Sequence, residues 1–261
     1  MTTKDIQLEI CGDHHEVAVI RLTRPAKRNA LNDALVLAIR DTFDTLPASV
    51  RAAVITGDGD HFCAGLDLSE LKERDAGQGL HHSRMWHAAL ERVQYGPVPV
   101  IAALHGAVVG GGLELASACH IRVADESTFY ALPEGSRGIF VGGGGSVRIP
   151  KLIGVARMTD MMLTGRVFNA ADGERIGLAQ YLVSAGQAFA KAFELAQRVA
   201  QNAPLTNYAL MHALPRIAEQ PADQGFFTEA MMAAIAQSAP EAKERVQAFL
   251  DGRAAKVQKA A

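Results

Sequence analysis

Two carboxylates and a run of glycines are the residues of this sequence whose types and spacing could do chemistry. Gly110 to Gly112 stand directly before an apolar segment that contains Glu114. Ordered glycine costs conformational entropy, so three in succession need a reason, such as a ligand that must approach the backbone. A carboxylate among apolar neighbours is partly desolvated, which raises its pKa and suits it to proton transfer. The stretch therefore predicts a site that binds a ligand and moves a proton.

Glu134 is the second candidate carboxylate. It follows Pro133 and lies between an aromatic stretch and another glycine-rich loop, residues 142–145. Two acids beside one ligand can divide the addition of a proton and the activation of water. The structural alternative for Glu114 is a favourable charge in the first turn of a helix, worth about 0.3–1 kcal/mol at an exposed position.

Backbone amides at two turns are candidate donors to a developing negative charge. The apolar run 99–104 predicts a strand, and the glycines after it lead into a helix whose first N–H groups lack partners. A second turn, in residues 57–71, places Ala64 and Gly65 in a loop of small residues. Two such amides aimed at one oxygen would form an oxyanion hole. Ordinary strand-to-helix turns explain the same glycines equally well.

The elements that must position these residues follow an α/β pattern. Most of the short apolar runs are followed by Gly, Asp or Asn and then by a helical pattern, which predicts an α/β core rather than a helical bundle or a β-sandwich. The predicted strands are 17–22, 52–57, 99–104, 121–124 and 181–183.

The last part of the chain reads as helices alone. Strand signals stop near residue 186, prolines divide the rest of the chain into several helices, and Pro240 fits the first turn of the last one. We therefore predict a core carrying the site in residues 1–186 and a helical section in 187–261. The apolar faces of this section can pack on the core or on another subunit; they contain Phe189, Phe193, Ala196, Ala200, Ala242, Val246, Phe249 and Leu250.

Composition limits the classes of partner. A chain of 261 residues with 49% hydrophobic content fits a globular protein, and a net charge of −2 provides no basic surface for nucleic acid. Three cysteines without CxxC spacing argue against a disulfide framework and a structural zinc site. We expect no metal.

The same reading predicts a cytoplasmic protein. The first residues have no apolar core of the kind that marks a signal peptide. The most apolar segment, 98–118, contains a histidine and a glutamate and is rich in glycine, so no membrane span is expected.

Five motifs occur in an order that resembles the enoyl-CoA hydratase/isomerase family, the crotonases. They are "RPAKRNAL" (24–31), "HFCAGLDL" (61–68), "HGAVVGGGLELASAC" (105–119), "LPEGSRG" (132–138) and "GGGGSVRIPKLIG" (142–154). Similar segments at 163–179 and 242–250 extend the resemblance over most of the chain. The resemblance implies a spiral of ββα repeats with a helical C-terminal section that forms trimers, often paired into hexamers.

The resemblance also implies the substrate and the site. The substrate would be an acyl-CoA thioester, so coenzyme A is part of the substrate and no further cofactor is expected. Residue by residue, the amides of Ala64 and Gly111 would bind the thioester oxygen, and Glu114 and Glu134 would be the two catalytic glutamates. The coenzyme A groove would contain Lys27, Ala64, Gly65, Leu66, Asp67 and Gly111.

The expected reaction is the reversible addition of water to a 2-enoyl-CoA, with the roles of the two glutamates left open. An isomerase that moves a 3,4 double bond, another acyl-CoA lyase of the family and a non-catalytic protein of the same fold are alternatives. A serine hydrolase and a nucleotide-binding protein fit less well, because the GxSxG, GxGxxG and P-loop motifs are all missing.

Two histidines depart from residues common in the family. His105 and His120 stand where many relatives have Asn and Asp. Either could exchange a proton. A hydrogen-bonded structural histidine is the more common case at a strand end.

Overall fold

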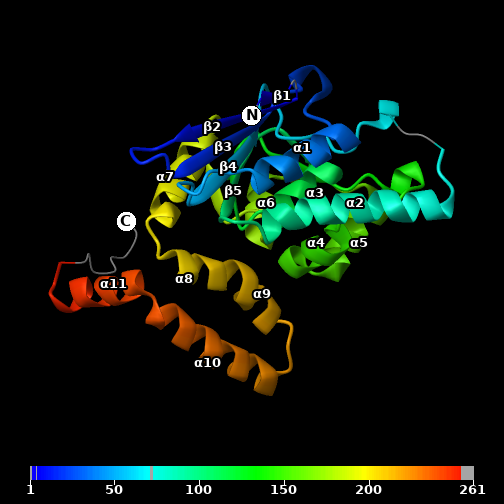
Figure 1. The fold of residues 1–261 in the computed structure, drawn as a ribbon. Helices are drawn as coiled ribbons and strands as arrows, with labels where there is room; N and C mark the ends of the chain where they lie inside the picture. Colours follow the sequence, from blue (N-terminus) through cyan, green and yellow to red (C-terminus); the bar gives the residue numbers. More distant parts are fainter. Residues whose placement is uncertain (1, 4, 71–72, 254–261) are drawn as a thin grey trace. The chain divides into compact units, whose positions relative to one another are not determined.

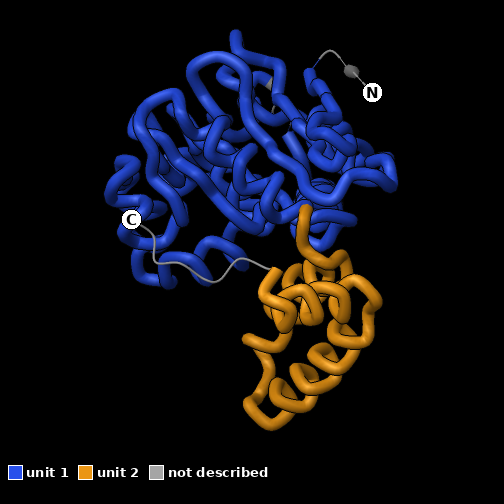
Figure 2. The backbone as a smooth tube through the Cα atoms, turned by 90° about the vertical axis from the view of Figure 1, so that its left-hand side faces the viewer, with its two compact units in different colours: residues 1–200 blue, residues 201–261 orange. Residues whose placement is uncertain are grey.

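The computed structural model describes residues 2, 3, 5–70 and 73–253, and the chain forms two compact units, 1–200 and 201–261 (Figure 2). The predicted division after residue 186 differs from the division that the structure has. Helix α7 (Ala188–Ala200) belongs to the first unit because its alanine face, with Ala192 and Ala196 fully buried, packs on the central sheet.

A seven-stranded sheet forms the centre of the first unit. Strands β1 to β3 are antiparallel, and every pairing from β3 to β10 is parallel. All five predicted strands are present, and the antiparallel strand β2 was not predicted. In sheet order the strands are β1 (Thr2–Thr3), β2 (Ile6–Cys11), β3 (Val17–Leu22), β4 (Ala52–Gly57), β5 (Val100–Leu104), β7 (Ile121–Asp125) and β10 (Tyr181–Val183).

Successive side chains of these strands point to opposite faces of the sheet, and each face packs into its own cluster of apolar residues. Val19, Val54 and Ile101 pack toward α7, whereas Ile20 and Ile55 on the same strands pack into the larger core on the other face. That larger core includes helices α1 (Asp33–Asp44), α2 (Ala76–Gln94) and α3 (Gly111–Ala118), which lie on the opposite side of the sheet from α7 (Figure 1). Both faces are covered, as expected for buried parallel strands.

A small second sheet positions the glycine turn. Strand β6 (Ala107–Val109) pairs in parallel with β8 (Phe129–Ala131), which pairs antiparallel with β9 (Phe168–Asn169). Helix α3 begins two residues after β6 ends. The remaining helical elements of the unit are η1 (Pro25–Lys27), η2 (Leu68–Glu70), η3 (Gly135–Arg137), α4 (Gly145–Ile153), α5 (Val155–Thr164) and α6 (Ala170–Ile176).

The second unit is helical, as predicted for this part of the chain. It contains α8 (Pro204–Tyr208), a π-helical turn η4 (Ala209–Ala213), α9 (Leu214–Ile217), α10 (Ala222–Ser238) and α11 (Pro240–Leu250). Pro240 occupies the first turn of α11, where its missing N–H costs nothing. Across the parts of the chain that the structure describes, no helix has both the length and the apolar character needed to cross a bilayer.

Candidate active site

A cavity of about 340 Å³ in the first unit contains both candidate carboxylates. Its walls come from α2, from the start of α3, and from the loops before α2, after β8 and before α4. The lining is mostly apolar, with a few polar groups, which is typical of small-molecule sites. The lining residues are Leu66, Arg74, Gly79, His82, Ser83, Trp86, Gly111, Glu114, Glu134, Ile139, Phe140, Val141, Gly142 and Gly143.

The glycine triplet is explained by close packing around the first turn of α3. A β-carbon on Gly112 would collide with the carbonyl oxygen of Cys63, and one on Gly110 would lie 2.6 Å from Glu134 Oε1. On Gly111 it would lie 3.3 Å from the Trp86 ring and 3.4 Å from the amide nitrogen of Leu66. The backbone at Gly111 is therefore open to the cavity and directly beside Leu66.

The amide of Ala64 is not the second oxyanion donor that the resemblance implies. Its N–H donates to the carbonyl oxygen of Arg28 at 2.9 Å, and Ala64 does not line the cavity. The prediction for this residue is corrected because a hydrogen-bonded N–H that points at another loop is not available to a ligand.

Leu66 supplies the amide that the site needs. Its neighbours are engaged by Leu31, since Leu31 N–H donates to the Gly65 carbonyl at 2.7 Å and Asp67 N–H donates to the Leu31 carbonyl at 2.8 Å. The Leu66 N–H has no acceptor within the described residues, and neither has that of Gly111, which opens α3. These two free amides lie next to each other at the cavity, since a β-carbon on Gly111 would lie 3.4 Å from the Leu66 nitrogen. Leu66 was predicted to line the groove but not to donate.

A local signal for this assignment lies at Gly65. Its φ of +96° turns the chain in a way that residues with side chains rarely adopt. The reversal separates the bonded amide of Ala64 from the free amide of Leu66.

Glu114 is held by the loop before α4. Its Oε1 accepts hydrogen bonds from the amides of Gly143 and Gly145, both at 2.8 Å. Burial raises the pKa of this carboxyl, while the two amides and the charge of Arg148 oppose that rise. Both of these hydrogen bonds end on Oε1, and the amide of Gly142, which lines the cavity, also lowers the pKa of this carboxyl.

Glu134 is also buried, but it has weaker support for a negative charge. Its Oε2 is buried without a hydrogen-bond partner in the described part of the chain. Burial raises the pKa of this carboxyl and the charge of Glu114 raises it further, while the backbone amide of Glu134 itself and the charge of Arg137 oppose the rise. The structure thus brings the two predicted carboxylates into one cavity with different surroundings.

Asp67 and Lys27 lie beside the cavity rather than in its wall. Asp67 is buried in an ion pair with Arg24 at 2.9 Å, and hydrogen bonds from Ser69 together with Arg24 lower the pKa of its carboxyl. Its side chain therefore holds the loop, and its predicted place in the coenzyme A groove stays a prediction. Lys27 is half exposed, with Nζ 3.2 Å from Ser69 Oγ, and its ammonium group borders the same loop.

Neither unusual histidine lines the cavity. His120 Nδ1 accepts from the Val100 amide at 2.9 Å, and its Nε2 lies 3.0 Å from the carbonyl oxygen of Gln94. His105 Nε2 lies 3.1 Å from the carbonyl oxygen of Gly59. These contacts join loops and strands and correspond to structural roles.

Helix α2 forms one wall through Trp86 and His82. The indole N–H of Trp86 donates to Asp33 Oδ1 at 3.1 Å, and His82 Nε2 lies 2.7 Å from the same oxygen. Asp33, at the start of α1, was not predicted to matter. It fixes Trp86 against the backbone of Gly111.

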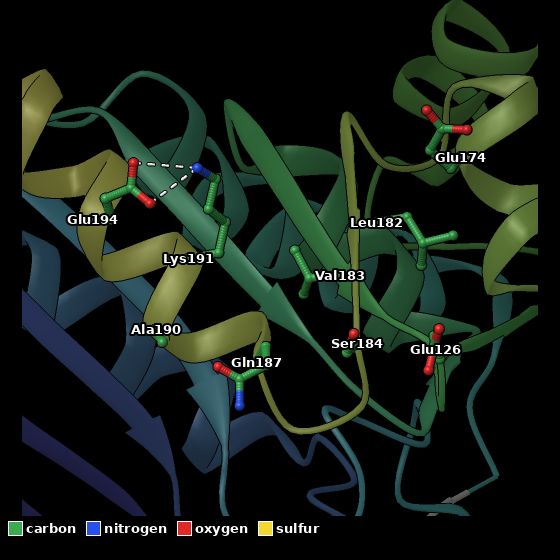
Figure 3. A pocket seen from close by; sticks show the side chains of 9 residues that line it. All are labelled: Glu126, Glu174, Leu182, Val183, Ser184, Gln187, Ala190, Lys191 and Glu194. Atoms are coloured by element: carbon green, nitrogen blue, oxygen red, sulfur yellow. Dashed lines mark hydrogen bonds and ion pairs between the residues drawn. The ribbon is translucent and has the colours of Figure 1, made fainter. Parts of the chain in front are cut away.

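A second cavity, about 860 Å³ and wide open, lies beside β10 and the start of α7 (Figure 3). It is lined by polar residues such as Glu126 and Glu174, and the ammonium group of Lys191 pairs with Glu194 at 2.9 Å. None of the predicted site residues lines it. Because Leu66, Gly111, Glu114 and Glu134 all line the smaller cavity and none of them lines this one, the smaller cavity is the candidate active site. No cluster of metal-ligating side chains occurs in residues 2, 3, 5–70 and 73–253.

Comparisons with known proteins agree with the resemblance seen in the motifs. The family model described as enoyl-CoA hydratase/isomerase matches residues 12–259. The chain is 32% identical over 248 residues to the 2,3-dehydroadipyl-CoA hydratase of Escherichia coli K12, covering 94% of this chain and 96% of that protein. It is 30% identical over 241 residues to enoyl-CoA hydratase EchA19 of Mycobacterium tuberculosis, covering 90% and 91%.

Solved structures share the fold over nearly the whole chain. A crystal structure from Rhodopseudomonas palustris CGA009, provisionally named an enoyl-CoA hydratase, has 60% identity and a TM-score of 0.92 over 95% of each chain. An enoyl-CoA hydratase from Bacillus anthracis has 32% identity and a TM-score of 0.88, covering 95% of this chain and 97% of that one. The predicted fold is confirmed.

Proposed function

Since this chain belongs to the enoyl-CoA hydratase/isomerase family, we propose that it adds water reversibly across the 2,3 double bond of a 2-enoyl-CoA thioester. One observation carries the proposal: a single apolar cavity contains two buried carboxylates and borders two free backbone amides. This combination matches what the reaction needs, which is a donor pair for the thioester oxygen and two proton-transfer groups beside the adjacent carbons.

The amides of Leu66 and Gly111 receive the thioester oxygen. Attack of water at C3 pushes electrons from the double bond toward the carbonyl and gives an enolate-like transition state. Donors already in place stabilise that charge without reorganisation, and one such donor is worth about 2.7–4 kcal/mol in a well-studied enzyme. The ammonium group of Lys27, at the edge of the same loop, is available to the phosphates of coenzyme A.

Glu114 is the base and Glu134 the acid. Glu114 accepts two amide hydrogen bonds and has Arg148 nearby, both of which favour its ionised form, so it takes a proton from the attacking water. Glu134 has a buried oxygen without a donor and a negative neighbour, both of which favour its neutral form, so it supplies a proton to C2. Two carboxyl groups whose surroundings differ in this way can divide acid and base roles.

The test is a direct assay of the purified protein with crotonyl-CoA and with a 3-enoyl-CoA. We expect loss of the enone absorbance with the first and slow or no conversion of the second. Preferred conversion of the 3-enoyl-CoA would instead identify an isomerase, which needs essentially one base, and no turnover of either would contradict the proposal for these substrates.

The acyl group is to be identified with a panel of thioesters. The mostly apolar lining, which includes Trp86, Ile139 and Phe140, favours an apolar acyl chain. The panel contains straight, branched and aromatic 2-enoyl-CoA compounds. It also contains 2,3-dehydroadipyl-CoA, because one relative is named for its hydration.

A further inference from the structure

Arg148 is a buried cation directly behind the loop that holds Glu114. It lies in α4 and is 9% exposed. Its Nε donates to Gln94 Oε1 at 2.7 Å, and its Nη1 donates to the carbonyl oxygen of Gly143 at 2.9 Å. Within the described residues no carboxylate oxygen lies within 4.0 Å of its guanidinium nitrogens. Its direct partners are therefore neutral oxygens, and the charges of Glu91 and Glu114 favour its ionised form from a greater distance.

The loop between them joins Arg148 to Glu114 through the backbone. Gly143 accepts from Arg148 with its carbonyl group and donates to Glu114 Oε1 with its amide. A β-carbon on Gly144 would collide with Arg148 Nη1, so the guanidinium lies immediately against the loop. Gly145, whose amide is the second donor to Glu114, begins the helix that carries Arg148.

We propose that Arg148 is a positioning residue for the reaction: it holds the loop 143–145 so that both amides bind Glu114 Oε1 and Oε2 faces the cavity. The proposal rests on the hydration chemistry argued above for Glu114 as the base. Arg148 acts through the loop: it contacts Gly143, which lines the cavity, but it does not line the cavity itself.

The charge of Arg148 acts on Glu114 in the same direction. It lowers the pKa of Glu114 against the effect of burial, and so increases the ionised fraction of the base. The titratable groups that face Arg148 are Glu91 and Tyr95 at the end of α2, Cys119 after α3, and Glu114 itself. Burial and the charge of Arg148 lower the pKa of His87 on α2, and the charge of Glu114 adds to the raised pKa of Glu134 that burial causes. None of these groups is replaced in the Arg148 variants, so a shift of the pH profile is to be attributed to Arg148.

The experiment compares Arg148→Gln and Arg148→Lys with Arg122→Gln in the full chain. Arg122 is a matched control because it is buried to a similar degree and its Nε and Nη1 donate to the carbonyl groups of Leu178 and Cys119. It is not among the groups that shift Glu114. Melting temperature, kcat, KM and the pH dependence of kcat are measured for each variant with crotonyl-CoA.

For Arg148→Gln we expect kcat to fall about 10- to 100-fold, as for a misplaced catalytic group, with KM changed less than about threefold. The acidic limb of the pH profile moves to higher pH, because Glu114 loses a stabilising charge. Arg148→Lys keeps the acidic limb but recovers only part of kcat, since an ammonium group cannot reproduce the guanidinium fork. Arg122→Gln lowers the melting temperature and leaves kcat and the acidic limb unchanged.

The proposal is overturned if Arg148→Gln keeps the wild-type kcat and acidic limb, or if Arg122→Gln changes both to the same degree. Should Arg148→Gln fail to fold, Gln94→Ala removes one anchor of the guanidinium. This variant is expected to lower kcat at constant KM, and a wild-type kcat in it would also refute the positioning role.

A titration of Glu114 by carboxyl carbon NMR separates this proposal from the proposed function. A higher Glu114 pKa in Arg148→Gln, found in a protein that hydrates no enoyl-CoA, would refute the function and keep the link between Arg148 and Glu114. An unchanged Glu114 pKa in an active protein would refute the link and keep the function.

Discussion

Glu114 and Glu134 lie in one cavity, yet their oxygens have different partners. Glu114 is bound by two amides, whereas an oxygen of Glu134 has no donor in the described chain. For both carboxyls burial is the largest cause of a raised pKa. The proposed division into a base and an acid therefore rests on the difference in hydrogen bonding rather than on burial.

Replacing either carboxyl by an amide removes one proton-transfer step. We expect Glu114→Gln and Glu134→Gln each to lower kcat about 10²- to 10⁴-fold with crotonyl-CoA, the range typical of a lost general acid or base. Glu126→Gln, an exposed residue of the open cavity by β10, is the control and should keep the wild-type kcat. Near-normal rates in a Glu114 or Glu134 variant that still binds acyl-CoA would contradict the assignment.

Two neighbouring glycines should respond differently to an added methyl group. In Gly111→Ala the methyl lies beside the amide of Leu66, so kcat should fall about 10²- to 10³-fold while the protein stays folded. In Gly112→Ala the methyl meets the carbonyl of Cys63, a backbone atom that cannot turn away, so stability should fall by about 1–3 kcal/mol. Activity assays and denaturant unfolding measure the two effects. A stable, fully active Gly111→Ala would show that this amide does not bind the thioester.

At the level of loops and helices, the loop that contains Leu31 must be hydrogen-bonded to the loop that contains Leu66 for the Leu66 amide to face the cavity. Leu31 bonds to both neighbours of Leu66, and the ion pair of Arg24 with Asp67 closes the same junction. Lys27 lies next to this junction, with Nζ 3.9 Å from Asp67 Oδ1. Elements far apart in the sequence thus set the direction of one N–H group.

Asp67→Asn tests the ion pair of Asp67 with Arg24 through the pH dependence of stability. The pKa of Asp67 is lowered by Ser69 and Arg24, so its carboxylate contributes stability above the pKa of an unfolded aspartate and loses that contribution as the pH falls through the lower, folded pKa. At neutral pH the variant should lose about 1.5–3 kcal/mol, the range for hydrogen bonds to a charged group.

The difference between wild type and Asp67→Asn should shrink as the pH falls below the pKa of an unfolded aspartate. Urea unfolding at several pH values measures it, with Asp160→Asn as a control for an exposed ion pair. A difference that stays constant down to the lowest pH at which the protein folds would show that the Asp67 charge is not the cause.

Across the protein as a whole, α10 and α11 of the second unit expose several large apolar side chains, three of them phenylalanines. Apolar surface of this kind is typical of contacts between subunits. The family resemblance implies trimers or hexamers, and we propose that these helices take part in that assembly. The exposed residues are Phe226, Phe227, Met231, Ile235, Val246, Phe249 and Leu250.

Charges on this surface should dissociate the assembly. Wild type should elute as a trimer or hexamer in size-exclusion chromatography with light scattering, and Phe226→Glu with Phe227→Glu should shift it toward the monomer. Lys243→Glu, an exposed polar position on α11, is expected to leave the mass unchanged. A monomeric wild-type protein at micromolar concentration would contradict the expected assembly.

Local sequence pattern was enough to predict the elements that depend on their own residues. Buried parallel strands such as β4 and β5 are nearly continuous apolar runs, and Pro240 marks the start of α11, so these elements were predictable. Strand β2 was not, because polar residues alternate with apolar ones along it and most of it is only partly buried. The two- and three-residue strands of the second sheet were not predictable either, because they pair with segments about 20 to 40 residues away.

The candidate acids and Gly111 were also predictable, because a carboxylate among apolar residues and a run of glycines are unusual wherever they occur. Folding was needed to establish that Leu66, and not Ala64, has the free amide, and that Asp67 and Arg148 support loops rather than line the cavity. The cause is that an N–H group that donates a hydrogen bond within the protein is not available to a ligand. Which N–H groups are engaged in this way is decided by chain segments that meet only when the protein folds.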